Sequence, residues 1–146
     1  MPQYFVVPVG IYHPVRVEEG DEDNFVPVLR REIGTARFDH NDVHTPWGLP
    51  IQVWVGDESL RGGHLEHNYR AIALLRDLGR DIADVGGVAV ITSYDPRSGD
   101  MVSPPPQALM HLEGAVDRGS LTTRPASVRA LTDEEVEAFL RARGLG

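Results

Sequence analysis

Residues 64–94, HLEHNYRAIALLRDLGRDIADVGGVAVITSY, contain the clearest pattern in this chain of 146 residues. One face of an α-helix is predicted by apolar residues at spacings of three and four, which are Leu65, Tyr69, Ile72, Leu75 and Leu78. Gly79 follows, at the place where a helix commonly ends in a left-handed cap. After a glycine pair, the apolar run 88–91 predicts a strand that is covered on both faces. A helix packed on an inner strand is therefore the expected centre of the fold.

Weaker patterns extend this prediction to both ends of the chain. Short apolar or alternating runs predict further strands, at 3–9, 11–17, 51–55 and 100–103. Helical spacing predicts further helices at 25–33, 103–118 and 132–143, whereas residues 35–50 show no regular pattern. Gly34 should close the first of these helices, Ser103 should cap the second, and Thr132 with Glu135 should form a capping box at the start of the third. We expect one α+β domain spanning residues 1–146, with a single small mixed or antiparallel sheet of about four to six strands and three or four packed helices.

Trp54 stands out within the strand predicted at 51–55. It alternates with Ile51, Val53 and Val55, so its side chain lies on the opposite face of that strand. A second layer of structure could cover it, or it could be an exposed anchor for a partner. We expect it to be covered, because a sheet between helices is buried on both faces.

Composition restricts the class of protein. The hydrophobic fraction of 41% and the charged fraction of 25% are ordinary for a soluble globular chain. Cysteine is absent, no window is long and apolar enough to span a membrane, and the N-terminus lacks the pattern of a signal peptide, so a cytoplasmic protein is expected. The net charge of -8 disfavours direct binding of nucleic acid, which requires clustered basic residues.

Four of the six histidines fall in two pairs, His40 with His44 and His64 with His67. Carboxylates lie near both pairs, and imidazoles with a carboxylate could bind a divalent metal such as zinc or manganese. The His-Glu-x-x-His spacing of zinc hydrolases is absent, however. We expect surface or capping roles for these histidines and no cofactor, with a metal site as the alternative.

A glycine pair between an arginine and a histidine comes immediately before the central helix. Backbone N–H groups at such a helix start can turn toward a phosphate or carboxylate, although a plain connector is the other interpretation. The loop 39–47 would border this site. The residues predicted to bind the ligand are Arg61, Gly62, Gly63, His64, His67, Asn68 and Trp47.

The order of elements over 25–103 resembles a family of small domains of unknown function from actinobacterial phages and plasmids. The matching features are a helix closed by glycine at 33–34, Asn68 followed by Ala71, and a glycine before the strand 88–90. The ending 131–140, LTDEEVEAFL, resembles the endings of these domains. The family has no activity to transfer. The resemblance implies an accessory protein of a mobile element that interferes with host defence or regulation.

Three functions follow from these observations. The first is a non-catalytic accessory protein that binds a host protein or a small anionic ligand, since no serine lies in a nucleophile elbow. The second is a metal-dependent hydrolase that uses the four paired histidines. The third is an acidic DNA mimic, which is disfavoured because the 14 arginines interrupt the negative charge. An exposed strand edge would also allow a homodimer.

Overall fold

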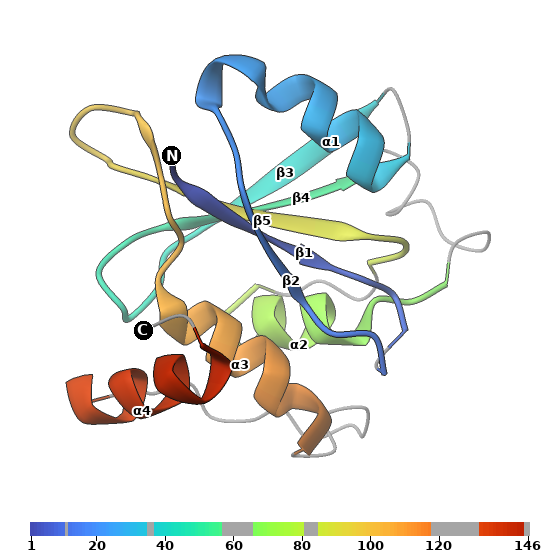
Figure 1. Cartoon of the computed structure of the whole chain (residues 1–146). Coiled ribbons are helices and arrows are strands. Elements are labelled where there is room, and N and C mark those ends of the chain that lie inside the picture. The colour runs from blue at the N-terminus through green and yellow to red at the C-terminus, as the bar shows by residue number, and fades with distance from the viewer. Residues whose placement is uncertain (11, 35–36, 57–65, 81–84, 118–131, 145–146) are drawn as a thin grey trace.

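An antiparallel sheet of six strands organises the part of the chain that this computed structural model describes, residues 1–10, 12–34, 37–56, 66–80, 85–117 and 132–144 (Figure 1). The strand order is β2-β1-β5-β4-β3, and β6 pairs with β5. The strands are β1 (Gln3–Val7), β2 (Arg16–Glu19), β3 (Phe38–Val43), β4 (Ile51–Gly56), β5 (Ala89–Tyr94) and β6 (Met101–Val102). The helices are the 3-10 helix η1 (Glu22–Asn24), α1 (Phe25–Ile33), α2 (Tyr69–Asp77), α3 (Pro106–Asp117) and α4 (Asp133–Arg143). The predicted α+β class with one small sheet is confirmed.

The helices lie on both faces of this sheet (Figure 1). α1 packs on one face, α2 and α3 cover the other, and α4 packs against α3. We call the two sides the α1 face and the α2–α3 face. Alternation along each strand sends side chains to both. In β4, Ile51, Val53 and Val55 belong to the core under α2 and α3, whereas Trp54 packs on the α1 face.

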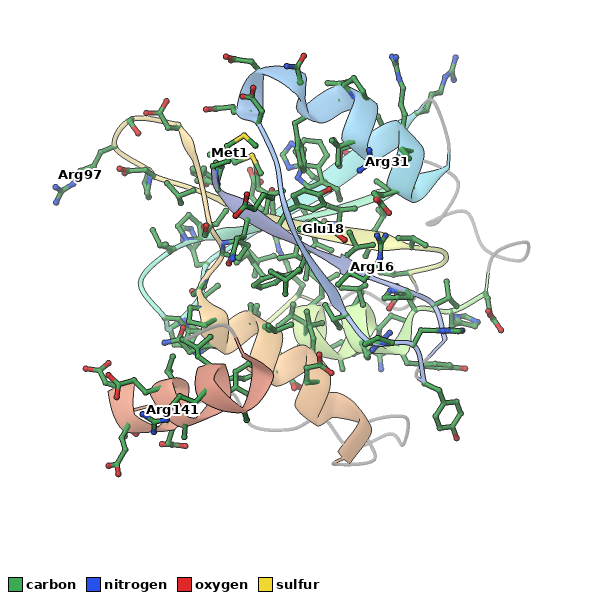
Figure 2. All side chains as sticks on the ribbon, viewed as in Figure 1. Met1, Arg16, Glu18, Arg31, Arg97 and Arg141 are labelled. Carbon is green, nitrogen blue, oxygen red and sulfur yellow. The ribbon has the colours of Figure 1, made fainter. Side chains whose placement is uncertain are left out.

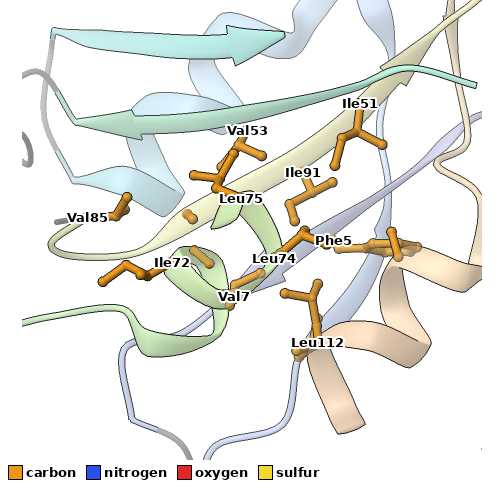
Figure 3. Close-up of a cluster of buried hydrophobic side chains, with 14 of the residues drawn as sticks. Phe5, Val7, Ile51, Val53, Ile72, Leu74, Leu75, Val85, Ile91 and Leu112 are labelled. Carbon is orange, nitrogen blue, oxygen red and sulfur yellow. The ribbon is translucent and has the colours of Figure 1, made fainter. Parts of the chain in front are cut away.

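The larger core lies on the α2–α3 face, where side chains of β1, β4 and β5 meet α2 and Leu112 of α3 (Figure 3). β5 is the inner strand of this arrangement, as the apolar run 88–91 predicts. Ala89 and Ile91 face α2 and α3, Val90 faces α1, and all three side chains are completely buried. The covered strand at the centre of the sequence is thus confirmed.

α2 begins later than the apolar spacing predicts. Its first residue is Tyr69, which is 44% exposed, whereas the next residue, Arg70, is only 2% exposed. The guanidinium of Arg70 donates to the carbonyl oxygens of Pro8 and Gly10 at 3.0 and 3.1 Å, so a charged residue takes the buried position. The prediction that Tyr69 belongs to the buried stripe was wrong, because a hydrogen-bonded arginine next to it packs against the chain after β1.

β3 is the element that the sequence pattern did not predict. Its residues, Phe38–Val43, are mostly polar, and β3 pairs only with β4 because it is the last strand of the sheet. An edge strand needs only one covered face and one hydrogen-bonded neighbour, so its sequence carries a weak signal.

Two helix ends show the predicted chemistry. Gly34 closes α1 in a left-handed conformation, and Thr132 forms a capping box with Glu135.

The bounds of two further elements differ from those predicted. Ser103 does not cap α3, which begins at Pro106; its hydroxyl instead accepts a hydrogen bond from the backbone N–H of Gln3 at 2.8 Å. The strand predicted at 100–103 is the two-residue β6.

No helix in the described part of the chain combines the length and the apolar character that crossing a membrane requires.

Candidate functional site

The ligand site predicted before α2 lies only partly within the described residues. Arg61, Gly62, Gly63 and His64 fall outside them. His67 is exposed, and its ring stacks on Tyr69 with the ring centroids 5.8 Å apart. The anion site itself therefore stays a prediction for the segment 61–64.

Asn68 has a structural role that accounts for its whole side chain. It is completely buried; its Nδ2 donates to the carbonyl oxygens of Val7 and Gly87, each at 2.9 Å, and its Oδ1 accepts from the N–H of Ala71 at 3.2 Å. The amide thus caps α2 and ties its start to β1 and to the residues before β5. We therefore assign Asn68 to the fold and no longer to the ligand site, because no polar atom of its side chain is left to face a ligand.

The strand register separates Trp47 from the start of α2. Asn68 is bonded to Val7, which pairs with the first residue of β5. Trp47 lies in the turn before Ile51, which pairs with Ser93 near the other end of β5. The turn before β4, which contains Trp47, and the start of α2 therefore lie at opposite ends of the sheet. The predicted site, in which the loop 39–47 borders His67 and Asn68, is not formed.

Three of the four histidines predicted as the alternative metal site, His40, His44 and His67, lie within the described residues, and they do not gather there. His40 lies on the α1 face, where Nδ1 is 2.9 Å from Asp42 Oδ1 and the ring lies 4.4 Å from that of Trp54. His44 is exposed beyond β3, whereas His67 precedes α2 on the other side of the sheet. Among the described residues, no group of three His, Asp or Glu side chains could hold a metal ion. His64 lies outside those residues.

Sequence reasoning missed a cavity that lies between α1 and the sheet. Its volume is about 380 Å³. α1 supplies an apolar wall, the strands supply aromatic rings, and the 95–100 hairpin and η1 border the opening. The lining residues are Glu22, Phe25, Val26, Leu29, Phe38, Gln52, Trp54, Thr92, Ser93, Tyr94, Gly99 and Met101. We call this feature the α1 cavity.

A chain of hydrogen bonds crosses the sheet side of the α1 cavity. Trp54 Nε1–H donates to Thr92 Oγ1 at 2.8 Å, and the Thr92 hydroxyl donates to Gln52 Oε1 at 3.0 Å. Phe38 packs edge-on against Trp54, with the ring centroids 5.9 Å apart. Trp54 is half-buried among α1-face residues, so α1 forms the second layer that its position on β4 predicts. Trp54 was the one sequence signal for this site, because a large ring opposite a buried face needs a cover.

A second hollow, of about 300 Å³, lies near the other end of α1. Its charged lining residues are already paired with each other. Arg16 forms ion pairs with Glu32 of α1 and with Glu18, the latter at 3.3 Å. Figure 2 places Arg16 and Glu18 in the region between β2 and α1. The arginine that lines this hollow is therefore already neutralised by carboxylates.

Buried charges also occur between α2 and α3, away from both hollows. His111 Nε2 lies 2.8 Å from Asp77 Oδ2, and both side chains are almost completely buried. Burial lowers the pKa of the Arg70 guanidinium, and the negative charge of Glu113 partly offsets this lowering. These groups join the two helices and do not line the α1 cavity.

Comparison with known proteins leaves the functional argument to the geometry. No protein-family model, no curated protein and no solved structure matches the chain.

Proposed function

We propose that the protein is a non-catalytic binding protein whose small-molecule ligand occupies the α1 cavity. The observation that carries this proposal is the cavity itself. Protein interiors are packed as densely as organic crystals, and small-molecule sites typically have volumes of roughly 300 to 1,000 Å³. A space of about 380 Å³ between a helix and an aromatic strand face falls within that range.

The lining residues favour binding over catalysis. Among them, only Glu22 and Tyr94 can titrate, and the lining holds no histidine to act as a general base. The hydroxyl of Ser93 donates to the carbonyl oxygen of Pro50 at 2.5 Å, and that of Thr92 is engaged by Gln52. A binding role without chemistry also fits the accessory protein that the family resemblance implies.

The charges of the residues that line the cavity argue against the anionic ligand that the sequence suggested. No arginine or histidine is among the described residues that line it, and Glu22 stands at its border. An anion would be repelled there, since nothing neutralises it. We therefore propose an uncharged, largely aromatic ligand for this site.

Toluene is a suitable first probe, because a dry apolar cavity binds simple aromatic rings. We expect its addition to shift the indole N–H resonance of Trp54 in a ¹⁵N-correlated NMR spectrum. The indole N–H of Trp47, at another place in the fold, is the internal control. A Trp54 resonance that does not move up to the solubility limit of toluene would contradict the proposal.

Two phenylalanine substitutions test whether the space is real. Leu29→Phe adds a ring where Leu29 lines the cavity, so it should abolish the toluene shift at a cost below about 1 kcal/mol in the free energy of unfolding. Leu112→Phe adds the same ring to the packed α2–α3 core and should cost about 1–3 kcal/mol while leaving binding intact. Equal costs, with toluene binding retained in Leu29→Phe, would show that toluene does not bind in the space beside Leu29 and would contradict the proposed site.

A further inference from the structure

The hydrogen-bond chain in the α1 cavity determines which atom of Gln52 can meet a ligand. An indole N–H can only donate, so Thr92 Oγ1 must accept from Trp54. That hydroxyl still carries its own proton, and in the structure it donates this proton to the carbonyl oxygen of Gln52, Oε1, at 3.0 Å. The amide nitrogen of Gln52 is therefore the atom directed away from Thr92.

The amide nitrogen of Gln52 carries two N–H donors, and neither has a partner within the described part of the chain. Gln52 lines the α1 cavity, so these donors are available to whatever occupies it. The other donors in this row of hydrogen bonds are already engaged. The indole N–H of Trp54 donates to Thr92, and the hydroxyl of Thr92 donates to Gln52 Oε1. A ligand atom that meets the amide nitrogen of Gln52 must therefore accept a hydrogen bond.

The surroundings of Gln52 describe the rest of the ligand. Aromatic rings of Phe25, Phe38, Trp54 and Tyr94 line the cavity, and such rings favour a flat aromatic partner. Among the described residues that line the cavity, Glu22 is the one acidic side chain and no arginine occurs, and Arg97 of the adjoining hairpin points away from the molecule (Figure 2). A carboxylate or phosphate would accept from Gln52 but would meet no cation.

We infer that the α1 cavity selects an uncharged aromatic compound with a carbonyl acceptor, such as an aryl ketone, amide or lactam, which Gln52 recognises through its side-chain N–H groups. This inference rests on the proposed function and names the ligand class. The geometry makes Gln52 the specificity residue, while the aromatic and α1 side chains supply contact area.

Acetophenone, benzoate and benzamidine form a probe set of nearly equal shape. Acetophenone is a neutral acceptor, benzoate is an anionic acceptor and benzamidine is a cationic donor. We expect acetophenone to bind the wild-type protein about tenfold more tightly than either ion, as measured by titration of the Trp54 indole resonance. Benzamidine cannot accept the hydrogen bond from Gln52, which is worth about this factor, and benzoate can accept it but loses its hydration without meeting a cation. Toluene, which lacks the carbonyl, reports occupation of the cavity alone.

Substitution of Gln52 identifies the group that reads the carbonyl. Gln52→Leu should weaken acetophenone binding about tenfold and change toluene binding less than about twofold. Gln52→Glu keeps the size of the side chain and the acceptor for Thr92 but presents an anionic oxygen to the cavity. It should reverse the preference, so that benzamidine binds more tightly than acetophenone.

The outcomes separate this inference from the function on which it rests. If toluene and acetophenone shift Trp54 but the Gln52 variants leave the order of the probes unchanged, the cavity binds ligands and Gln52 does not select them. If no probe shifts Trp54, the proposed function itself is overturned. Gln52→Glu serves as the second test should Gln52→Leu fold poorly.

Discussion

Replacement of Asn68 tests the structural role that the fold assigns to it. Asn68→Ala removes three side-chain hydrogen bonds from a completely buried position, two to the carbonyl oxygens of Val7 and Gly87 and one from the N–H of Ala71. At about 1 kcal/mol for each bond, the expected loss in the free energy of unfolding is about 3 kcal/mol. The two orphaned carbonyls make this a lower bound, because a buried acceptor without a partner costs more than the bond itself.

Asn24 provides a matched control for this change. It holds the same N-cap position on α1, but it is exposed and its side chain makes no capping hydrogen bond. Asn24→Ala should therefore cost less than about 0.5 kcal/mol. Asn68→Asp keeps the acceptor for Ala71 but turns a carboxylate toward two carbonyl oxygens, so it should be no more stable than Asn68→Ala.

Urea unfolding followed by circular dichroism measures all three variants. The slope of the free energy against urea should not change, so that the midpoints can be compared directly. The reasoning would be refuted if Asn68→Ala and Asn24→Ala lost the same stability. A stable Asn68→Ala protein would return Asn68 to the candidates for ligand binding.

Three other changes test the remaining contacts. Thr92→Val should lower the free energy of unfolding by about 1–2 kcal/mol and move the indole N–H resonance of Trp54, because that donor loses its acceptor; an unmoved resonance would contradict the hydrogen-bond chain. Burial raises the pKa of the Tyr4 hydroxyl above its ordinary value of 10.0, so urea unfolding should show stability that is complete below about pH 10 and falls above it. Tyr4→Phe should lose less stability over that range, and an identical decline would refute the assignment. Asp77→Ala should lower the free energy of unfolding by about 3 kcal/mol, because it leaves His111 buried without its carboxylate. Adding His111→Leu should recover part of this loss in urea unfolding. If the effects of the two substitutions on stability simply added, the pair would not be coupled.

Binding at the α1 cavity would also raise apparent stability, which gives a simple screen. A ligand at a hundred times its dissociation constant adds about 2.7 kcal/mol to the free energy of unfolding when it binds only the folded chain. The uncharged aromatic carbonyl compounds proposed above are the first class to screen in this way. Leu29→Phe is the appropriate negative control, since it fills the cavity.

Local signals in the sequence were sufficient for much of the fold. The alternation at 51–55 predicted β4 and its two faces, and the apolar run 88–91 predicted an inner strand that proves to be covered on both sides. Gly34 and the Thr132–Glu135 capping box marked helix ends correctly. These signals succeed because the period of a strand, a left-handed glycine and a capping box depend on residues only a few positions apart.

The candidate site was beyond such local reasoning. The position of Trp54 indicated that something must cover the second face of β4, but not that α1 would cover it incompletely. The α1 cavity joins residues of η1, α1 and four strands, from Glu22 to Met101, and the pairing of those strands decides which of them meet. The same pairing placed Trp47 and the start of α2 at opposite ends of the sheet.

Residue order and spacing thus determined the class of fold, most of its elements and the faces that each buries, because those follow from backbone periodicity. Strand order and helix placement decided where a space was left and which polar side chains line it. They depend on contacts between segments that are distant in the chain, and the hydrogen bonds of Thr92 with Trp54 and Gln52, about 40 positions away, exist only after the sheet has formed.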